Sequence, residues 1–143
     1  MTEEHLTRRG ADKVQHVEMF LFNYPRVRGL SLFVNLSSLS IMQQQLTRIE
    51  GLDACVHLKH LWVVECRVSA IEGLDACVNL ERLYLYGNRI ERVERLDRLT
   101  SLRVLWLCDN EIRVVEGLEN LAQLRELNLA RNRVERCAEA LLA

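Results

Sequence analysis

The chain has 143 residues, 49% of them hydrophobic, and its 19 Lys and Arg residues nearly balance 20 Asp and Glu residues. This balance excludes binding to nucleic acid through a large excess of positive charge, and no apolar run approaches the roughly 20 residues of a membrane span. The polar start, Met1 to His5, is followed by no apolar signal core, so we expect the protein to stay in the cytoplasm or a connected compartment.

Residues 1–28 are predicted to form a lead-in and a capping segment. The first twelve residues are expected to be mobile, and the capping segment begins at residue 13. It suits either a strand in the register of the following repeats or a short helix, whose shared face would hold Val14, Val17, Leu21 and Tyr24. Pro25 lacks a backbone N–H, so such a helix would end before it. In either form this segment would cover the edge of the next strand.

A 22-residue period organises residues 29–138 into one domain of five units, which are 29–50, 51–72, 73–94, 95–116 and 117–138. Seven offsets hold an apolar residue in every unit; in the third unit they are Leu74, Cys77, Leu80, Leu83, Leu85, Ile90 and Val93. Since only about half of the chain is hydrophobic, chance does not explain this match. A fixed period of this length predicts a solenoid of stacked turns.

The spacing inside a unit predicts a strand followed by a turn. Leu83 and Leu85 are two residues apart, which is the period of a strand with one buried face. Asn88 follows, with Asn110 and Asn132 at the same offset, and an amide there can satisfy backbone groups where the chain leaves the strand. The first two units have Gln44 and Cys66 at this offset, so we expect weaker hydrogen bonding in their turns.

The resulting pattern, Leu-x-x-Leu-x-Leu-x-x-Asn-x-Ile-x-x-Val, resembles the leucine-rich repeat. The Ile-Glu-Gly-Leu sequence at residues 49–52 and 71–74 is similar to the subgroup typified by the phosphatase regulator SDS22. The resemblance implies an α/β solenoid, a curved right-handed superhelix with a parallel β-sheet on its concave face and short 3-10 or helical turns on its convex face. Residues 139–143 form an incomplete end, so we expect a fragment or short form of a longer repeat protein, or an end covered by a partner or second copy.

The outward positions of the strands carry the main functional prediction. Equal offsets in a parallel stack form ladders across the sheet, and one ladder reads Ser40, Trp62, Tyr84, Trp106 and Asn128. Because leucines fill the inward offsets, the rings are expected to lie on the concave face, where large aromatic side chains mark binding sites. The alternative is that the rings only stiffen the sheet through cross-strand packing.

This ladder and its neighbours make up the predicted partner-binding site, which consists of Trp62, Tyr84, Trp106, Tyr86, His60, Arg82, Val64, Met42, Asp109 and Asn128. Three further charged residues, Glu65, Glu126 and Arg131, complete a polar rim. The rim is mixed in sign, so it suits a helix or loop of another protein better than a phosphate backbone.

Two other groups have both a functional and a structural interpretation. Cys55 and Cys77 share an interior offset, and are either a redox or metal pair or two small buried hydrophobic residues. Acidic ladders, which could bind a cation or cap the outer turns, consist of Glu50, Glu72, Glu94 and Glu116 and of Asp53, Asp75, Asp97 and Glu119. Nearby cations, Arg48, Arg92 and Arg136, can offset the repulsion. We favour the structural interpretation of both groups.

No catalytic pattern is evident, because the histidines occupy non-equivalent offsets and the sequence contains no Gly-rich phosphate loop, His-Glu-x-x-His motif or nucleophile elbow. We therefore expect a non-enzymatic protein-interaction domain without a metal or cofactor. The segments 18–20, 24–27, 61–62 and 83–86 are similar to long leucine-rich repeat proteins related to axonemal dynein light chains, which implies a ciliary or flagellar scaffold. The alternatives are a regulatory subunit of protein phosphatase 1 of the SDS22 type and a protein-binding subunit of an RNA particle.

Overall fold

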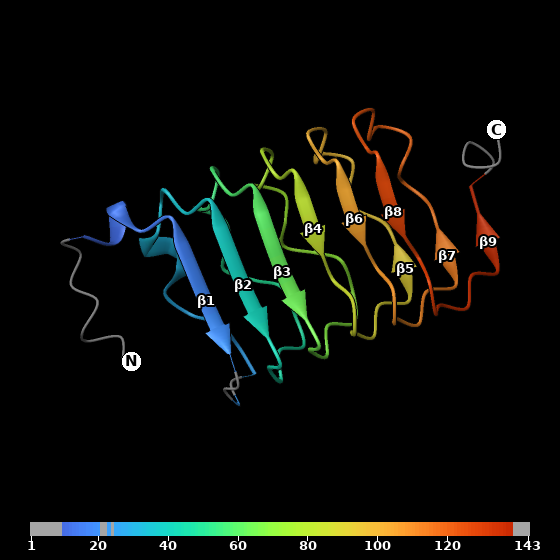
Figure 1. The fold of residues 1–143 in the computed structure, drawn as a ribbon, viewed down its shortest axis with the longest axis horizontal. Helices are drawn as coiled ribbons and strands as arrows, with labels where there is room; N and C mark the ends of the chain where they lie inside the picture. The colour runs from blue at the N-terminus through green and yellow to red at the C-terminus, as the bar shows by residue number, and fades with distance from the viewer. Residues whose placement is uncertain (1–9, 21–22, 24, 139–143) are drawn as a thin grey trace.

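The computed structural model describes residues 10–20, 23 and 25–138. Figure 1 shows a stack of parallel turns, with one row of strands in front and shorter strands behind. The predicted mobile lead-in and the incomplete end fall largely or wholly on residues outside the described ranges, as do Leu21 and Tyr24 of the helical alternative. No helix in the described part of the chain is long and apolar enough to cross a membrane.

Six parallel strands form the main sheet, in the order β1-β2-β3-β4-β6-β8. They are β1 (His16–Phe20), β2 (Ser38–Met42), β3 (His60–Val64), β4 (Arg82–Tyr84), β6 (Val104–Trp106) and β8 (Glu126–Asn128). Each strand pairs with the next at a shift of one 22-residue unit, so that Leu61 lies opposite Leu83 and Leu83 opposite Leu105. The stacked register is the one that the period predicts.

The capping segment contains a strand. Residues of β1 pair with β2 from His16 opposite Ser38 to Phe20 opposite Met42, which extends the same 22-residue shift toward the N-terminus. Val17 and Met19 pack against the core, as their register position requires. Of the two alternatives for this segment, the strand is therefore the one that the structure contains.

The outer turns are shorter than the α/β class implied, and the described residues contain no α-helix. Their helical elements are two 3-10 helices, η2 (Ala11–Lys13) and η3 (Leu30–Leu32). In the third unit the outer stretch closes with two successive i→i+3 bonds, in which Cys77 N donates to Leu74 O at 2.9 Å and Leu80 N to Cys77 O at 3.1 Å. The stretch between seam and strand is less than two α-helical turns long, so the fold is a parallel β-solenoid with 3-10-type turns.

A second sheet lies behind the first and was not predicted. It joins β5 (Arg92–Val93), β7 (Val114–Val115) and β9 (Arg136–Cys137) in parallel. These strands are only two residues long, too short to show an alternating pattern in the sequence. They satisfy backbone groups where each turn runs back across the stack.

The core fills the space between the two rows. All seven repeat offsets are buried in the first four units, but in the fifth only Leu118 and Leu121 are. The side chains of Leu127 and Val134 are 37% and 40% exposed. Burial of the apolar offsets is thus complete over most of the stack and declines along β8 and β9.

The asparagine ladder closes the turns as predicted. Asn88 Nδ2 donates to Val63 O at 2.7 Å and Leu85 O at 2.9 Å, and its Oδ1 accepts from Val68 N at 3.1 Å. Asn110 and Asn132 repeat this arrangement. Gln44, in contrast, donates once, to Met42 O, and the Cys66 thiol reaches carbonyl oxygens only at 3.4 and 3.9 Å. The first two turns are therefore bonded more weakly, as expected.

Candidate functional site

The open face of the main sheet, defined as the face that carries Trp62, Tyr84 and Trp106, is the candidate site. The strand register places these three residues side by side on β3, β4 and β6. Their sequence neighbours Leu61, Leu83 and Leu105 are fully buried on the other side of the sheet, whereas the three rings are half-buried. The rings therefore lie outside the core, where the alternation of the strand directs them.

The three rings pack against one another. Trp62 and Tyr84 are stacked with centroids 5.0 Å apart and planes 8° apart, and Trp106 meets Tyr84 edge to face at 5.2 Å. Trp106 Nε1 also donates a hydrogen bond of 2.6 Å to Glu126 Oε1 on β8. The rings therefore do pack across the strands, as the alternative interpretation expected. Because this packing holds the rings in place, less entropy is lost when a partner binds.

A second row of apolar residues follows the rings toward the C-terminal ends of the strands. Tyr86 and Met42 are half-buried there, as expected for surface residues. Val64 was expected on the surface, but the structure corrects this: it is only 3% exposed, and Cys108 at the same offset is 7% exposed. Both flank Tyr86, the largest side chain of the row.

Phe20 extends this second row and was missed in the sequence. It lies opposite Met42 in the β1–β2 register and is 41% exposed, so it adds a ring to the same face. The signal was present, because Phe20 stands 22 residues before Met42. The inward offsets alone predicted a strand here, and the predicted site did not extend to the outward residues of β1.

The predicted polar rim lies around the rings, and several of its members are already hydrogen-bonded. Asp109 pairs with Arg131 through both carboxylate oxygens, one of them 2.6 Å from Nη2. The hydrogen bond from Arg131 lowers the pKa of Asp109. Asn128 Oδ1 accepts a bond from Ala130 N at 3.0 Å. Arg82 is exposed beside His60 on the neighbouring strand.

His60 is the one rim residue with a buried polar atom that lacks a partner within the described part of the chain, namely its Nδ1. Burial lowers the pKa of His60, and the positive charge of Arg82 lowers it further. The ring lies 6.1 Å from that of Trp62. The imidazole therefore favours its neutral form at the edge of the aromatic row.

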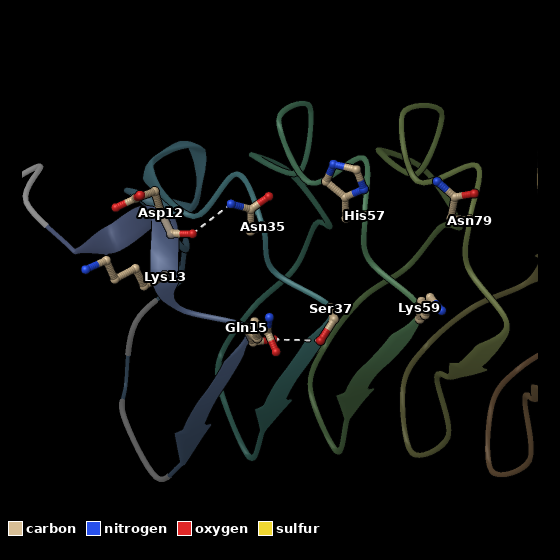
Figure 2. Close-up of a pocket in the computed structure, with 8 residues that line it drawn as sticks. All are labelled: Asp12, Lys13, Gln15, Asn35, Ser37, His57, Lys59 and Asn79. Carbon is tan, nitrogen blue, oxygen red and sulfur yellow. Dashed lines mark hydrogen bonds between the residues drawn. The ribbon is translucent and has the colours of Figure 1, made fainter.

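A polar groove of about 500 Å³ adjoins the open face at the N-terminal ends of β1, β2 and β3 (Figure 2). It is lined by Asp12, Lys13, Gln15, Asn35, Ser37, His57, Lys59 and Asn79. Asn35 and Asn79 hold adjacent turns together by donating to Asp12 O and Val56 O, each at 2.8 Å. His57 occupies the same offset between them and makes no hydrogen bond to a described residue. The groove was not predicted from the sequence.

Glutamates of the seam form ion pairs, and the two cysteines that share an interior offset, Cys55 and Cys77, are buried. At the seam, Arg48 Nε lies 2.8 Å from Glu72 Oε1 and Arg92 Nη2 lies 2.9 Å from Glu116 Oε1, so exposed ion pairs offset the repulsion between stacked acids. Cys77 is fully buried with a pKa raised to about 12 by burial. Within the described ranges no group of three or more His, Cys, Asp or Glu side chains is placed to hold a metal ion.

Comparison with known proteins supports the repeat architecture. Residues 78–134 match the leucine rich repeat family. No protein of curated function matches the chain. Among solved structures, an internalin from Listeria monocytogenes is 25% identical, covering 73% of this chain and 32% of its own, with a TM-score of 0.66. TLR13, solved in complex with ssRNA13, is 26% identical, covering 72% of this chain and 16% of its own, with a TM-score of 0.68.

A third solved structure shares the fold at lower sequence identity. Internalin C2 from Listeria monocytogenes is 20% identical, covers 90% of this chain and 57% of its own, and has a TM-score of 0.75. The chain therefore spans between 16% and 57% of the length of these three structures.

Proposed function

We propose, from the premise that the chain is a leucine-rich repeat protein, that it is a non-enzymatic domain that binds a helix or loop of another protein. The partner would dock on the open face, which we expect to be concave. The observation that carries this proposal is the row of mutually packed rings of Trp62, Tyr84 and Trp106 on the side of the sheet that the core does not use. Large, pre-positioned aromatic side chains bury much area at little cost in entropy.

A protein partner is favoured over a nucleic acid. TLR13 was solved with ssRNA13, so a solenoid of this kind is compatible with an extended ligand. The present chain has a formal net charge of −1, and its open face carries Glu18, Glu65 and Asp109 as well as Arg82. Phosphate backbones are bound mainly through an excess of Lys and Arg, which this face lacks.

The finer assignment rests on resemblance alone. The N-terminal part of the chain resembles the start of leucine-rich-repeat-containing protein nine, and we propose a scaffold role in a cilium or flagellum on that basis. The alternative is a regulatory subunit of protein phosphatase 1 of the SDS22 type, although the chain has fewer repeats than those regulators. Cytoplasmic or ciliary location is part of the same proposal.

A pull-down from ciliated and non-ciliated cells, with the chain as bait, tests the function. Axonemal proteins would support the scaffold, and phosphatase catalytic subunit would support the regulator. Recovery should be lost with Trp62→Ala plus Trp106→Ala and retained with Val56→Ala plus Val78→Ala. The latter valines are 41% and 40% exposed on outer turns, so they control for the loss of surface apolar area. Equal recovery by all baits, each with an unchanged melting temperature, would reject the site.

A further inference from the structure

We infer that the segment bound by the open face is acidic as well as apolar, and that its carboxylates accept hydrogen bonds from donors that the face leaves unused. This inference rests on the proposed function and specifies the chemistry of the partner. Some polar groups on the face are already hydrogen-bonded within the protein, and others are not.

The acceptors of the face near the rings are largely engaged within the protein. Glu126 accepts from Trp106 Nε1 at 2.6 Å, and Glu65 accepts from Gln43 Nε2 at 3.0 Å. Asp109 is held through both oxygens by Arg131, and the side-chain oxygen of Asn128 accepts from a backbone N–H. A partner that offered mainly donors would compete with these bonds.

The donors, in contrast, are available. Trp62 Nε1, the hydroxyls of Tyr84 and Tyr86 and the guanidinium of Arg82 make no hydrogen bond or ion pair to any described residue. None of these atoms is among the buried atoms without partners, so water reaches them. An indole N–H and a guanidinium can only donate, so burying them under a partner without acceptors would leave them unsatisfied.

The ring geometry favours the same sign of charge. Trp62 and Tyr84 are nearly parallel, at 8° and 5.0 Å, so each covers one face of the other. The edge of an aromatic ring carries the positive part of its quadrupole, whereas cations bind to the face. The face that each ring turns toward the other is closed to a cation, and the ring edges suit a carboxylate better than a lysine or methyl-lysine side chain.

The groove adds cationic and neutral donors beside the rings. Lys59 immediately precedes β3 and is 3.7 Å from Glu81, a loose and exposed pair, and His57 lines the same groove. Figure 2 shows that the Asp12 carboxylate points away from His57 and Lys59. Lys59 is three residues from Trp62, which is about 10 Å along a strand. The partner would thus carry a carboxylate about 10 Å from its apolar anchor.

The main acidic exception lies at the margin of the site. Glu18 on β1 is exposed and makes no hydrogen bond to a described residue. Ser40 lies between it and Trp62 in the sheet register, which separates it from the rings by two strand spacings, or about 10 Å. Arg82 is adjacent to the rings and pairs with no described carboxylate, whereas Glu126, the acid beside Trp106, is already hydrogen-bonded to that ring.

A selection from a random peptide library tests this chemistry without knowledge of the natural partner. The open face is about 24 Å across from β1 to β8, which a helix of about 16 residues spans, so 16-residue peptides are displayed on phage. The complete chain and its Trp62→Ala plus Trp106→Ala variant serve as baits. The expected result is enrichment, on the unsubstituted chain only, of peptides with apolar residues at helical spacing and at least one Glu or Asp.

The outcomes separate the two proposals. Enrichment of peptides without Glu or Asp that still depends on the tryptophans would reject the acidic partner while leaving the binding face intact. Enrichment equal on both baits, or absent, would reject the face itself and the acidic partner with it. Circular dichroism of the variant ensures that a loss of folding is not mistaken for a loss of binding.

The best selected peptide then tests the donors directly, with affinity read from tryptophan fluorescence because both tryptophans lie on the face. Arg82→Gln should weaken binding about tenfold, as expected for the loss of a charge-assisted hydrogen bond, whereas Arg113→Gln should not. Arg113 is exposed and paired with Glu135, away from the rings. Replacing the glutamates of the peptide by lysine should abolish binding. Equal affinity of both peptides, or no effect of Arg82→Gln, would overturn the inference.

Discussion

The main sheet has an inner row of side chains, which faces the core, and an outer row on the open face. The two rows are one residue apart in sequence, and their side chains pack against different partners. Leu61, Leu83 and Leu105 are fully buried and belong to the continuous core of the stack. Trp62 and Tyr84 are half-buried, and their main packing partners are other rings of the same row. The difference shows how the alternation of a strand separates residues that stabilise the solenoid from residues available for recognition.

The largest expected effect comes from breaking the inner row. Leu83→Ala leaves a cavity in a site that is fully buried, and such changes cost about 2–5 kcal/mol. Tyr84→Ala removes stacking on the outer row and should cost only about 0.5–1.5 kcal/mol. Urea unfolding of both variants gives the two free energies. Equal losses would mean that the outer row belongs to the core and is not a separate surface.

The turns at the end of the inner row provide the second test. Asn88→Ala removes the hydrogen bonds to Val63 O and Leu85 O and leaves Val68 N without its acceptor. Because an unsatisfied buried group costs about 1–3 kcal/mol, the variant should be less stable by that amount.

The reciprocal change is Cys66→Asn, which restores the asparagine at a turn where the thiol makes only long contacts. It should raise the free energy of unfolding by about 1 kcal/mol. A destabilised Cys66→Asn variant would show that this turn has a geometry of its own. Thermal unfolding of Asn88→Ala and Cys66→Asn, each compared with the unsubstituted chain, measures the two changes in stability.

The inner row was predictable from the sequence and the outer row only in part. Seven apolar offsets at a fixed period define which residues face inward. Once those residues must be buried, each strand can pair with its neighbour in only one register. Exposure on the outer side depends instead on the size of the neighbours across the sheet. That is why Val64 and Cys108 are buried beside Tyr86, although their offset points outward.

Other features depend on backbone pairing that residue types do not specify. The strands of the second sheet are two residues long and have no pattern of their own. The groove lies where His57 stands at the offset of Asn35 and Asn79, which each donate a hydrogen bond to the adjacent turn. The donor-rich character of the open face likewise depends on which acids are already engaged.

His60 sharpens the comparison because it stands on the outer face but has a buried ring nitrogen. Its folded-state pKa lies below its usual value, so the unfolded chain binds the proton more readily. Stability should therefore fall as the pH drops through about 6.5, the unfolded-state value.

Replacing the residue by the serine of the preceding strand, His60→Ser, should flatten this part of the pH dependence. Free energies of unfolding measured between pH 8 and pH 5 for both proteins test this. A parallel pH dependence of the two would show that the imidazole is not desolvated in the folded state.

The last test changes the stability least. The rate at which each cysteine thiol reacts reports directly how accessible the inner and outer rows are. Cys55 and Cys77 lie in the core, and burial raises the pKa of both thiols. Cys108 belongs to the outward row and is 7% exposed, whereas Cys137 is exposed. Since the thiolate is the reactive form, Ellman's reagent at pH 8 should label one thiol rapidly in the native protein and the others only as the stack opens.

The control variant Cys137→Ser should remove the rapid phase and leave the slow phases unchanged. The informative residue is then Cys108, because it reports how tightly the side chains around Tyr86 close over the outward row. If it reacts as slowly as Cys55 and Cys77, the outer row is packed before any partner binds. Rapid labelling of Cys108 would mean that this row moves in solution, and a bound peptide should then protect it.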